Sequence, residues 1–133
     1  MKGYLVQIED ATRKNENYRQ VLFTARHSQL VLMSLKPGEE IGEEVHDLDQ
    51  FIRFEAGEGT VVLDGESHAV ADGHAVVIPA GTRHNVVNRS KQAVLKLYSI
   101  YSPPEHKSGT VHRTKKEADA DEHHHFDGKT SLG

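Results

Sequence analysis

Between residues 18 and 102 the chain is a succession of short β-prone runs, most of them closed by glycine, proline or an acidic turn residue. Runs of this kind occupy residues 18–24, 30–35, 51–55, 60–63, 67–70, 75–78, 86–87 and 93–101. Strands that recur at intervals of roughly 8–12 residues, with no helical stretch between them, are typical of an antiparallel sandwich or barrel. The sequence therefore predicts an all-β fold for this part of the chain.

The sharpest turn signal is the dipeptide Asp64-Gly65, which separates two of these runs. Asp-Gly suits the two-residue turns that join antiparallel strands, because both central positions of such a turn require positive φ. We expect residues 60–63 and 67–70 to form one hairpin.

The two ends of the chain have a different pattern. Residues 8–14 suit a short helical turn, and Thr114 and Glu117 have the spacing of a capping box that opens a short helix. From Asp119 onward the chain is charged and rich in small residues, so this tail is expected to be flexible. The predicted organisation is an N-terminal segment 1–17, a β-barrel domain 18–104 and a C-terminal extension 105–133.

The length of 133 residues suits one domain with a single core. The chain has no cysteine, which excludes disulfides, iron–sulfur clusters, thiol nucleophiles and cysteine-based zinc fingers. Its net charge of −4 argues against a nucleic-acid partner or a polybasic membrane surface. No apolar run approaches the ~20 residues that span a bilayer, and the N-terminus lacks an apolar signal core, so we expect a cytoplasmic protein.

Histidine is the unusual residue type, with ten in the chain. Because cysteine is absent, a metal bound by this chain would have nitrogen and oxygen ligands. In one segment Glu44 and His46 stand two residues apart, which in a strand places both side chains on one face. Gln50 follows four residues later and faces the same way if Leu48 keeps the strand phase. In a second segment His84 follows a buried strand and a Pro-x-Gly turn.

These two segments resemble the two sequence motifs of the cupins, small β-barrels of the jelly-roll type. The first cupin motif is glycine, five residues, His-x-His, three or four residues, glutamate, six residues and glycine. In this chain the same spacing is met by Gly38, Glu44, His46, Gln50 and Gly57.

The second cupin motif is matched at every position, by Gly73, Pro79, Gly81, His84 and Asn88. The resemblance implies an antiparallel double-stranded β-helix, or jelly-roll barrel, with a short C-terminal helical or flexible tail. It implies much less about function, because cupin barrels host unrelated activities on one scaffold.

Glu44 stands where the family usually has its first histidine, and Gln50 where it usually has glutamate. Carried over by position, the resemblance implies that Glu44, His46, Gln50 and His84 would hold one divalent ion per chain. Two interpretations are open. In one, two histidines and a carboxylate, with the amide as fourth ligand, bind Mn, Fe, Ni, Co or Zn. In the other, half of the site has degenerated and no metal is bound tightly.

On the first interpretation the metal serves as a Lewis acid on a sugar, a uronate or a hydroxy- or keto-acid, and the reaction is an isomerisation or tautomerisation. An Fe(II)-dependent dioxygenase is the alternative that the same ligands allow. On the second interpretation the chain is a small-ligand-binding or sensor barrel without turnover. All three predict a small-molecule partner. We also expect a homodimer, because an open barrel has strand edges to protect.

Further polar residues are candidates for a role at the site. Arg53, Tyr98 and Arg83 are candidates for contacts with a substrate. His106, just after the last predicted strand, could offer an acid or base if its segment folds over the barrel mouth. The run His123–His125 is interpreted as incidental to the site.

Overall fold

The computed structural model describes residues 2–133, and most of its regular structure is strand. In chain order the elements are α1 (Ile8–Lys14), β1 (Arg19–Thr24), β2 (Gln29–Leu35), β3 (Asp49–Ala56), β4 (Glu58–Leu63), β5 (Glu66–Ala71), β6 (Ala75–Ile78), β7 (His84–Val87), β8 (Leu95–Ser102), β9 (Val111–His112) and α2 (Lys115–Ala120). Over these residues, neither helix is long and apolar enough to cross a membrane.

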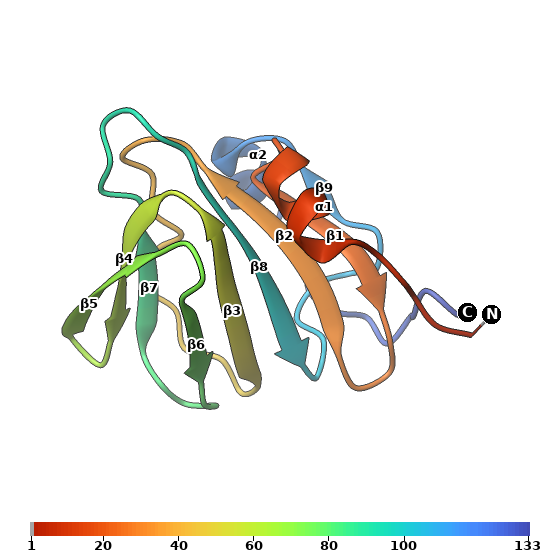
Figure 1. Ribbon diagram of the computed structural model, residues 1–133. Coiled ribbons are helices and arrows are strands. Elements are labelled where there is room, and N and C mark those ends of the chain that lie inside the picture. The colour runs from red at the N-terminus through yellow and green to blue at the C-terminus, as the bar shows by residue number, and fades with distance from the viewer. Residues whose placement is uncertain (1) are drawn as a thin grey trace.

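Two antiparallel sheets enclose one core (Figure 1). The larger has six strands in the order β6-β3-β8-β2-β1-β9, and the smaller has three in the order β5-β4-β7. Val61 and Val86 of the small sheet belong to the same buried cluster as Ile52, Phe54 and Leu97 of the large sheet. This is the antiparallel jelly-roll barrel that the sequence predicts.

The β4–β5 hairpin forms at the predicted turn. Leu63 pairs with Glu66, and the two residues between them, Asp64 and Gly65, have φ of 47° and 80°. Positive φ at both central positions is the conformation of a tight two-residue hairpin turn. Strands β1–β3 and β6–β8 lie close to predicted runs, because each run is bounded by residues that favour turns, whereas β9 lies outside all of the predicted runs.

The large sheet has an inner face toward the core and an outer face. Along β8, Leu95, Leu97, Ser99 and Tyr101 are buried and the residues between them are more exposed, which is the alternation of a strand covered on one side. The helix α1 lies across the outer face, close to β8 and β3 (Figure 1).

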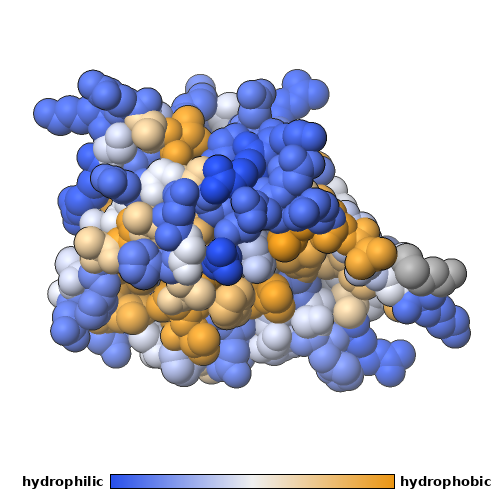
Figure 2. Space-filling view, in the orientation of Figure 1, coloured by the Kyte–Doolittle hydropathy of each residue, from blue (hydrophilic) through white to orange (hydrophobic). Residues whose placement is uncertain are grey.

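Part of the outer face is apolar and exposed. Val77 of β6 and Ile100 of β8 are 64% and 36% exposed, and Tyr4 and Leu5 in the segment before α1 are also exposed. Hydrophobic side chains form a band across the face that Figure 2 shows. Exposed apolar patches of this kind often mark interaction surfaces.

The predicted N-cap of the C-terminal helix is confirmed. α2 begins directly after Thr114, whose Oγ1 accepts a hydrogen bond from the backbone N–H of Glu117 at 3.2 Å. This bond satisfies one of the backbone donors that the first turn of a helix leaves free.

The tail after α2 returns to the barrel. The backbone N–H of Lys107 donates to the carbonyl of His124 at 2.7 Å, and the N–H of Phe126 donates to the carbonyl of Glu105 at 2.9 Å. Composition does not reveal such long-range backbone pairing, which satisfies polar groups as a sheet does. The tail therefore includes a stretch that pairs with residues 105–107, which its composition does not predict.

Candidate metal centre

Backbone hydrogen bonds join the two motif segments. The N–H of Glu44 donates to the carbonyl of His84 at 2.8 Å, and the N–H of His84 donates back at 2.9 Å. The N–H of Gly81 donates to the carbonyl of His46 at 2.8 Å, from a backbone with φ of 85° that glycine adopts without strain. Glu44 forms a single bridge with His84 and is not part of a continuous strand, so pairing between the segments places it beside His46 and His84.

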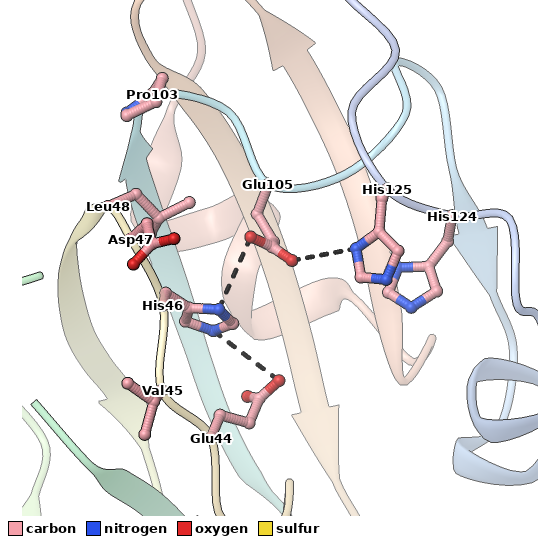
Figure 3. A pocket seen from close by; sticks show the side chains of 9 residues that line it. All are labelled: Glu44, Val45, His46, Asp47, Leu48, Pro103, Glu105, His124 and His125. Atoms are coloured by element: carbon pink, nitrogen blue, oxygen red, sulfur yellow. Dashed lines mark hydrogen bonds and ion pairs between the residues drawn. The ribbon is translucent and has the colours of Figure 1, made fainter. Parts of the chain in front are cut away.

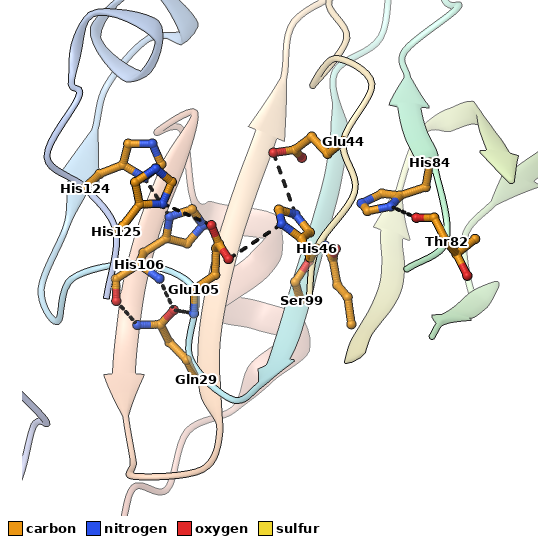
Figure 4. A network of polar contacts seen from close by, with 11 residues as sticks. Gln29, Glu44, His46, Thr82, His84, Ser99, Glu105, His106, His124 and His125 are labelled. Carbon is orange, nitrogen blue, oxygen red and sulfur yellow. Dashed lines mark hydrogen bonds and ion pairs between the residues drawn. The ribbon is translucent and has the colours of Figure 1, made fainter. Parts of the chain in front are cut away.

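Glu44, His46 and His84 direct potential ligand atoms toward one point. One oxygen or nitrogen atom of each lies within 4.8 Å of the others. The imidazole rings of His46 and His84 have centroids 5.3 Å apart, and Figure 4 shows the side chains of Glu44 and His84 on two different sides of His46. Two imidazoles and one carboxylate form the two-His-one-carboxylate set that binds divalent transition metals.

His84 has the hydrogen bonding expected of a metal ligand. Its Nδ1 is 2.9 Å from the carbonyl oxygen of Thr82, so Nδ1 carries the hydrogen and Nε2 carries the lone pair. That Nε2 atom is buried and has no hydrogen-bond partner among residues 2–133. Histidines that bind metals commonly donate their second N–H to a carbonyl in this way, which fixes the tautomer and the ring orientation.

His46 lies between two carboxylates (Figure 3). Its Nε2 is 3.7 Å from Oε2 of Glu44, and its Nδ1 is 3.6 Å from Oε2 of Glu105. Interaction with Glu44 raises the pKa of His46 against the opposing effect of burial, and the charge of Glu105 adds to the rise. Burial by itself would raise the pKa of Glu44, but His46, together with the charges of Arg19 and His84, outweighs burial and the pKa of this carboxyl is lowered. A cation at Nε2 would take the place of the proton there, with the carboxylate of Glu105 facing Nδ1 at 3.6 Å.

Gln50 lies at the start of β3 on the inner face and is 4% exposed. Its Nε2 donates to Oγ of Ser99 at 3.2 Å, whereas its Oε1 is buried without a partner in the described part of the chain. Opposite Gln50 on β8 is Tyr101, whose ring meets that of His46 edge-on with centroids 6.2 Å apart. Gln50 therefore offers a buried amide oxygen in the neighbourhood of the cluster.

The residues present fit a divalent ion. Nε2 of His84 and Oε1 of Gln50 are buried acceptors without partners among the described residues, and leaving such an atom unsatisfied costs about 1–3 kcal/mol. Coordination of a cation would satisfy both. One carboxylate, two neutral imidazoles and one amide give a donor set of nitrogen and oxygen that suits Mn, Fe, Co, Ni or Zn. These contacts favour an intact site over a degenerated one.

A pocket of about 570 Å³ opens beside Glu44 and His46. Its walls come from three separate stretches of chain: the loop 44–48, Pro103 and Glu105 after β8, and His124 and His125 of the tail (Figure 3). The tail histidines are therefore not incidental in position, because the tail returns to the barrel mouth. Sequence reasoning expected the segment that begins at Glu105 to be able to fold over the barrel mouth but named His106 as its candidate, and it missed His124 and His125, since no spacing in the chain links them to Glu44.

Gln29 holds the segment of Glu105 and His106 on the large sheet (Figure 4). Its side chain is 1% exposed. Oε1 accepts from the N–H groups of Glu105 at 3.2 Å and of His106 at 3.0 Å, and Nε2 donates to the carbonyl of His106 at 2.7 Å. These bonds fix the position from which Glu105 reaches His46.

The structure does not bring the other predicted contact residues to this site. Arg53 pairs with Tyr98 across β3 and β8, and both point to the outer face, where Arg53 Nε lies 3.0 Å from Glu55. Arg83 is exposed and donates to Glu43 at 2.6 Å. His106 does fold back toward the barrel, but it is 3% exposed and does not line the pocket.

Comparison with known proteins agrees with the fold. The family model described as Cupin domain matches residues 31–101. The protein YrkC of Bacillus subtilis (strain 168) is 48% identical over 128 residues, which cover 91% of this chain and 68% of YrkC. A protein of Acanthamoeba polyphaga mimivirus is 47% identical over 113 residues, covering 81% of this chain and 70% of that protein.

A solved structure is also closely similar. The crystal structure of BH2720 from Bacillus halodurans superposes with a TM-score of 0.87 and 46% sequence identity, and the match covers 90% of this chain and 96% of BH2720. The match therefore includes most of both chains.

Proposed function

The chain belongs to the cupin family, and we propose that it binds one divalent metal ion through Glu44, His46, His84 and Gln50 and acts there on a small oxygen-rich molecule. The observation that carries the proposal is the convergence of three ligand atoms within 4.8 Å of one another. It is supported by Nε2 of His84, which is buried without a partner in the described chain, since buried side-chain nitrogens are usually hydrogen-bonded.

When bound, a divalent ion would supply Lewis acidity toward a carbonyl or hydroxyl oxygen. The residues of the chain set the geometry for it. Thr82 fixes the orientation of His84, and Glu105 faces Nδ1 of His46, so each imidazole keeps Nε2 for the shared centre. The pocket of about 570 Å³ beside Glu44 has room for a small acid or a sugar.

Glu105 and His125 are the pair placed to move a proton. Nδ1 of His125 lies 3.2 Å from Oε1 of Glu105, and both residues line the pocket. A carboxylate beside an imidazole orients the ring and stabilises its protonated form, which makes the other ring nitrogen an effective acid or base. We infer that His125 exchanges a proton with the substrate, giving isomerisation or tautomerisation of a sugar, a uronate or a hydroxy- or keto-acid.

Metal analysis of protein purified without an affinity tag tests the proposal. We expect about one divalent ion per chain in the wild type and a loss of that ion in His46→Ala and His84→Ala. The matched control replaces His123, His124 and His125 together by Gln, which removes the tail imidazoles and should leave the metal content unchanged. A wild type without metal after reloading, or a content that follows the tail and not His46, would overturn the proposal.

An Fe(II)-dependent dioxygenase is the second candidate, favoured by the two-His-one-carboxylate geometry of Glu44, His46 and His84. Anaerobic loading with Fe(II), followed by oxygen and candidate hydroxy- or keto-acids, separates the two activities. Oxygen uptake coupled to product formation would support the dioxygenase. Conversion of the substrate without oxygen uptake would support the isomerase.

We also propose that two chains associate through the exposed hydrophobic band of the outer face. Val77 lies on β6, which is an edge strand of the large sheet, and Ile100 lies on the same face. A second copy would cover both the apolar side chains and the strand edge. Light scattering coupled to size exclusion should give twice the mass of one chain for the wild type and the mass of a single chain for Val77→Asp. A wild type that is monomeric at all concentrations would refute the dimer.

A further inference from the structure

A second polar group, here called the arginine–histidine cluster, lies in the barrel interior. Its members are Arg19 of β1, His106, His112 of β9 and His124 of the tail. The first three of these side chains are 6%, 3% and 4% exposed. The ring of Tyr101 lies between His106 of the cluster and His46 of the metal centre, with centroids 5.2 Å and 6.2 Å away, whereas His124 of the cluster lines the pocket beside Glu44.

Arg19 is a buried cation without an anion. It lies directly opposite Met33, and Val21 two residues later shares its face; both are core residues, so Arg19 points inward. It forms no ion pair with a carboxylate of the described chain, and its Nε is buried there without a partner. A buried charge is costly unless it is paired, so this position is energetically incomplete.

Neither side-chain contact of the guanidinium supplies a negative charge: Cζ of Arg19 lies 5.4 Å from the centroid of the Tyr18 ring, and its side-chain hydrogen bond goes to an imidazole. Nη1 of Arg19 lies 3.1 Å from Nδ1 of His112, and because arginine only donates, Nδ1 must accept. Nε2 of His112 then carries the hydrogen and donates it to Oδ2 of Asp121 at 2.9 Å. Asp121 thus fixes a neutral tautomer of His112 that orients Arg19 and leaves the charge of the guanidinium uncompensated.

His106 presents a second buried atom without a partner. Its Nδ1 is 3.0 Å from Nδ1 of His124, so one of these nitrogens donates and the other accepts (Figure 4). When His124 donates, Nε2 of His106 carries a hydrogen, and that atom is buried with no acceptor among residues 2–133. Burial, and after it the charge of Arg19, lowers the pKa of His106 and of His124. The same charge lowers the pKa of Glu44, so Arg19 lies within electrostatic reach of both groups.

We propose that Arg19 binds the anionic group of the substrate, which is a small carboxylate-bearing hydroxy acid or keto-acid. A carboxylate offers two oxygens to the planar fork of a guanidinium and would supply the missing negative charge. Its hydroxyl or keto oxygen would then face the metal centre, and this part of the inference rests on the proposed function. A neutral sugar would leave Arg19 without an anion.

Glycolate and its neutral isostere glycolamide are the probes, titrated into the metal-free full-length protein by calorimetry. We expect glycolate to bind and glycolamide to bind at least about tenfold more weakly, since a charged hydrogen-bonding pair is lost. Arg19→Met should lower the affinity for glycolate by about tenfold or more. Arg19→Lys should lower it less, because lysine keeps the positive charge and loses only the planar fork of the guanidinium. The matched control is Arg53→Met, which removes an arginine from the outer face and should change neither affinity.

A readout without substitution covers the case in which the Arg19 variants do not fold. In the wild type, the 15N signal of the buried Arg19 Nε–H should shift with glycolate and not with glycolamide. An unmoved signal, or wild-type glycolate affinity in Arg19→Met, would overturn the inference. Because these measurements need no metal, a chain that binds glycolate through Arg19 and never binds metal would refute only the proposed function. A chain that binds metal but whose affinity for glycolate does not depend on Arg19 would refute only the inference.

Discussion

The metal centre and the arginine–histidine cluster are built from the same residue type and have opposite preferences. In the metal centre, His46 lies between Glu44 and Glu105, and its pKa is raised. In the cluster, His106 faces another imidazole under the influence of Arg19, and its pKa is lowered. Neighbouring charge and burial therefore decide which ion each group attracts. The first group favours a cation and the second an anion.

The difference also explains why a count of histidines is a poor guide to metal binding. A bound cation needs neutral imidazoles with a carboxylate at hand, because the carboxylate supplies the charge. The histidines of the cluster lie beside Arg19, and no carboxylate of the described chain pairs with that guanidinium. A metal ion placed there would be repelled by the arginine, whereas a carboxylate would not.

The largest effect expected is from Glu44→Gln, which removes the only carboxylate among the proposed ligands. Metal affinity should fall by more than the about 10–100-fold that loss of an outer-shell partner causes. Competition with a chromogenic chelator measures it. Glu43→Gln is the matched control, because Glu43 is exposed and pairs with Arg83. Equal affinities of the two variants would exclude Glu44 as a ligand.

Glu105→Gln should have the next largest effect, because it removes the carboxylate that faces Nδ1 of His46 at 3.6 Å. We expect metal affinity to fall by about 10–100-fold. The pKa of His46 in the metal-free protein should fall toward its ordinary value, since the charge of Glu105 contributes to raising it. NMR titration measures that pKa, and Glu122→Gln in the exposed part of the tail is the control. An unchanged pKa with lost metal binding would indicate a structural role only.

The parts of the site that could be predicted from the sequence are those that local spacing controls. The ligand set Glu44, His46 and His84 could be predicted because their two segments match the spacing of the cupin motifs, and the resemblance implies that the segments meet. The backbone bonds that join Glu44 to His84 and Gly81 to His46 are themselves long-range. The hairpin at Asp64-Gly65, in contrast, needs only the conformational preferences of its two turn residues.

The rest depends on contacts that no local pattern contains. Glu105 and His124 reach the site through the bridge between His106 and His125, and Arg19 reaches the interior by pairing with His112. The candidate Arg53, which does not lie at the site, could have been placed correctly from the sequence. It lies three residues from Gln50, and residues an odd number apart in a strand point to opposite faces. The same rule that placed Gln50 on the inner face therefore places Arg53 on the outer face, as observed.

The cluster should make the folded state less stable in acid. Burial, with the charge of Arg19, lowers the pKa of His106, whereas the unfolded chain gains this proton below about pH 6.5. The unfolded state then binds more protons than the folded state. The free energy of unfolding therefore decreases as the pH is lowered, by up to about 1.4 kcal/mol per pH unit through this one residue. The stability is fully present above about pH 6.5 and is lost progressively below it.

His106→Gln isolates this contribution from that of His46, whose raised pKa acts in the opposite direction. Urea denaturation of the metal-free protein over a series of acid pH values should show a shallower loss of stability in His106→Gln than in the wild type. His27→Gln, at an exposed position, should follow the wild type. Parallel curves for His106→Gln and the wild type would show that His106 does not remain neutral in the folded chain.

The smallest effect expected is from Gln50→Glu, which should increase the difference between the ion preferences of the two regions. The introduced carboxylate would replace the buried Oε1 and could accept from the hydroxyl of Ser99, so a bound ion gains a charged ligand. Metal affinity should rise by up to about tenfold, the free-energy equivalent of one charged contact of about 1.4 kcal/mol. The added negative charge should at the same time weaken the binding of glycolate to the metal-free protein. Gln92→Glu, at an exposed position, should change neither. If Gln50→Glu increased the affinity for both the metal ion and glycolate, the cation-selective and anion-selective regions would not be electrostatically distinct.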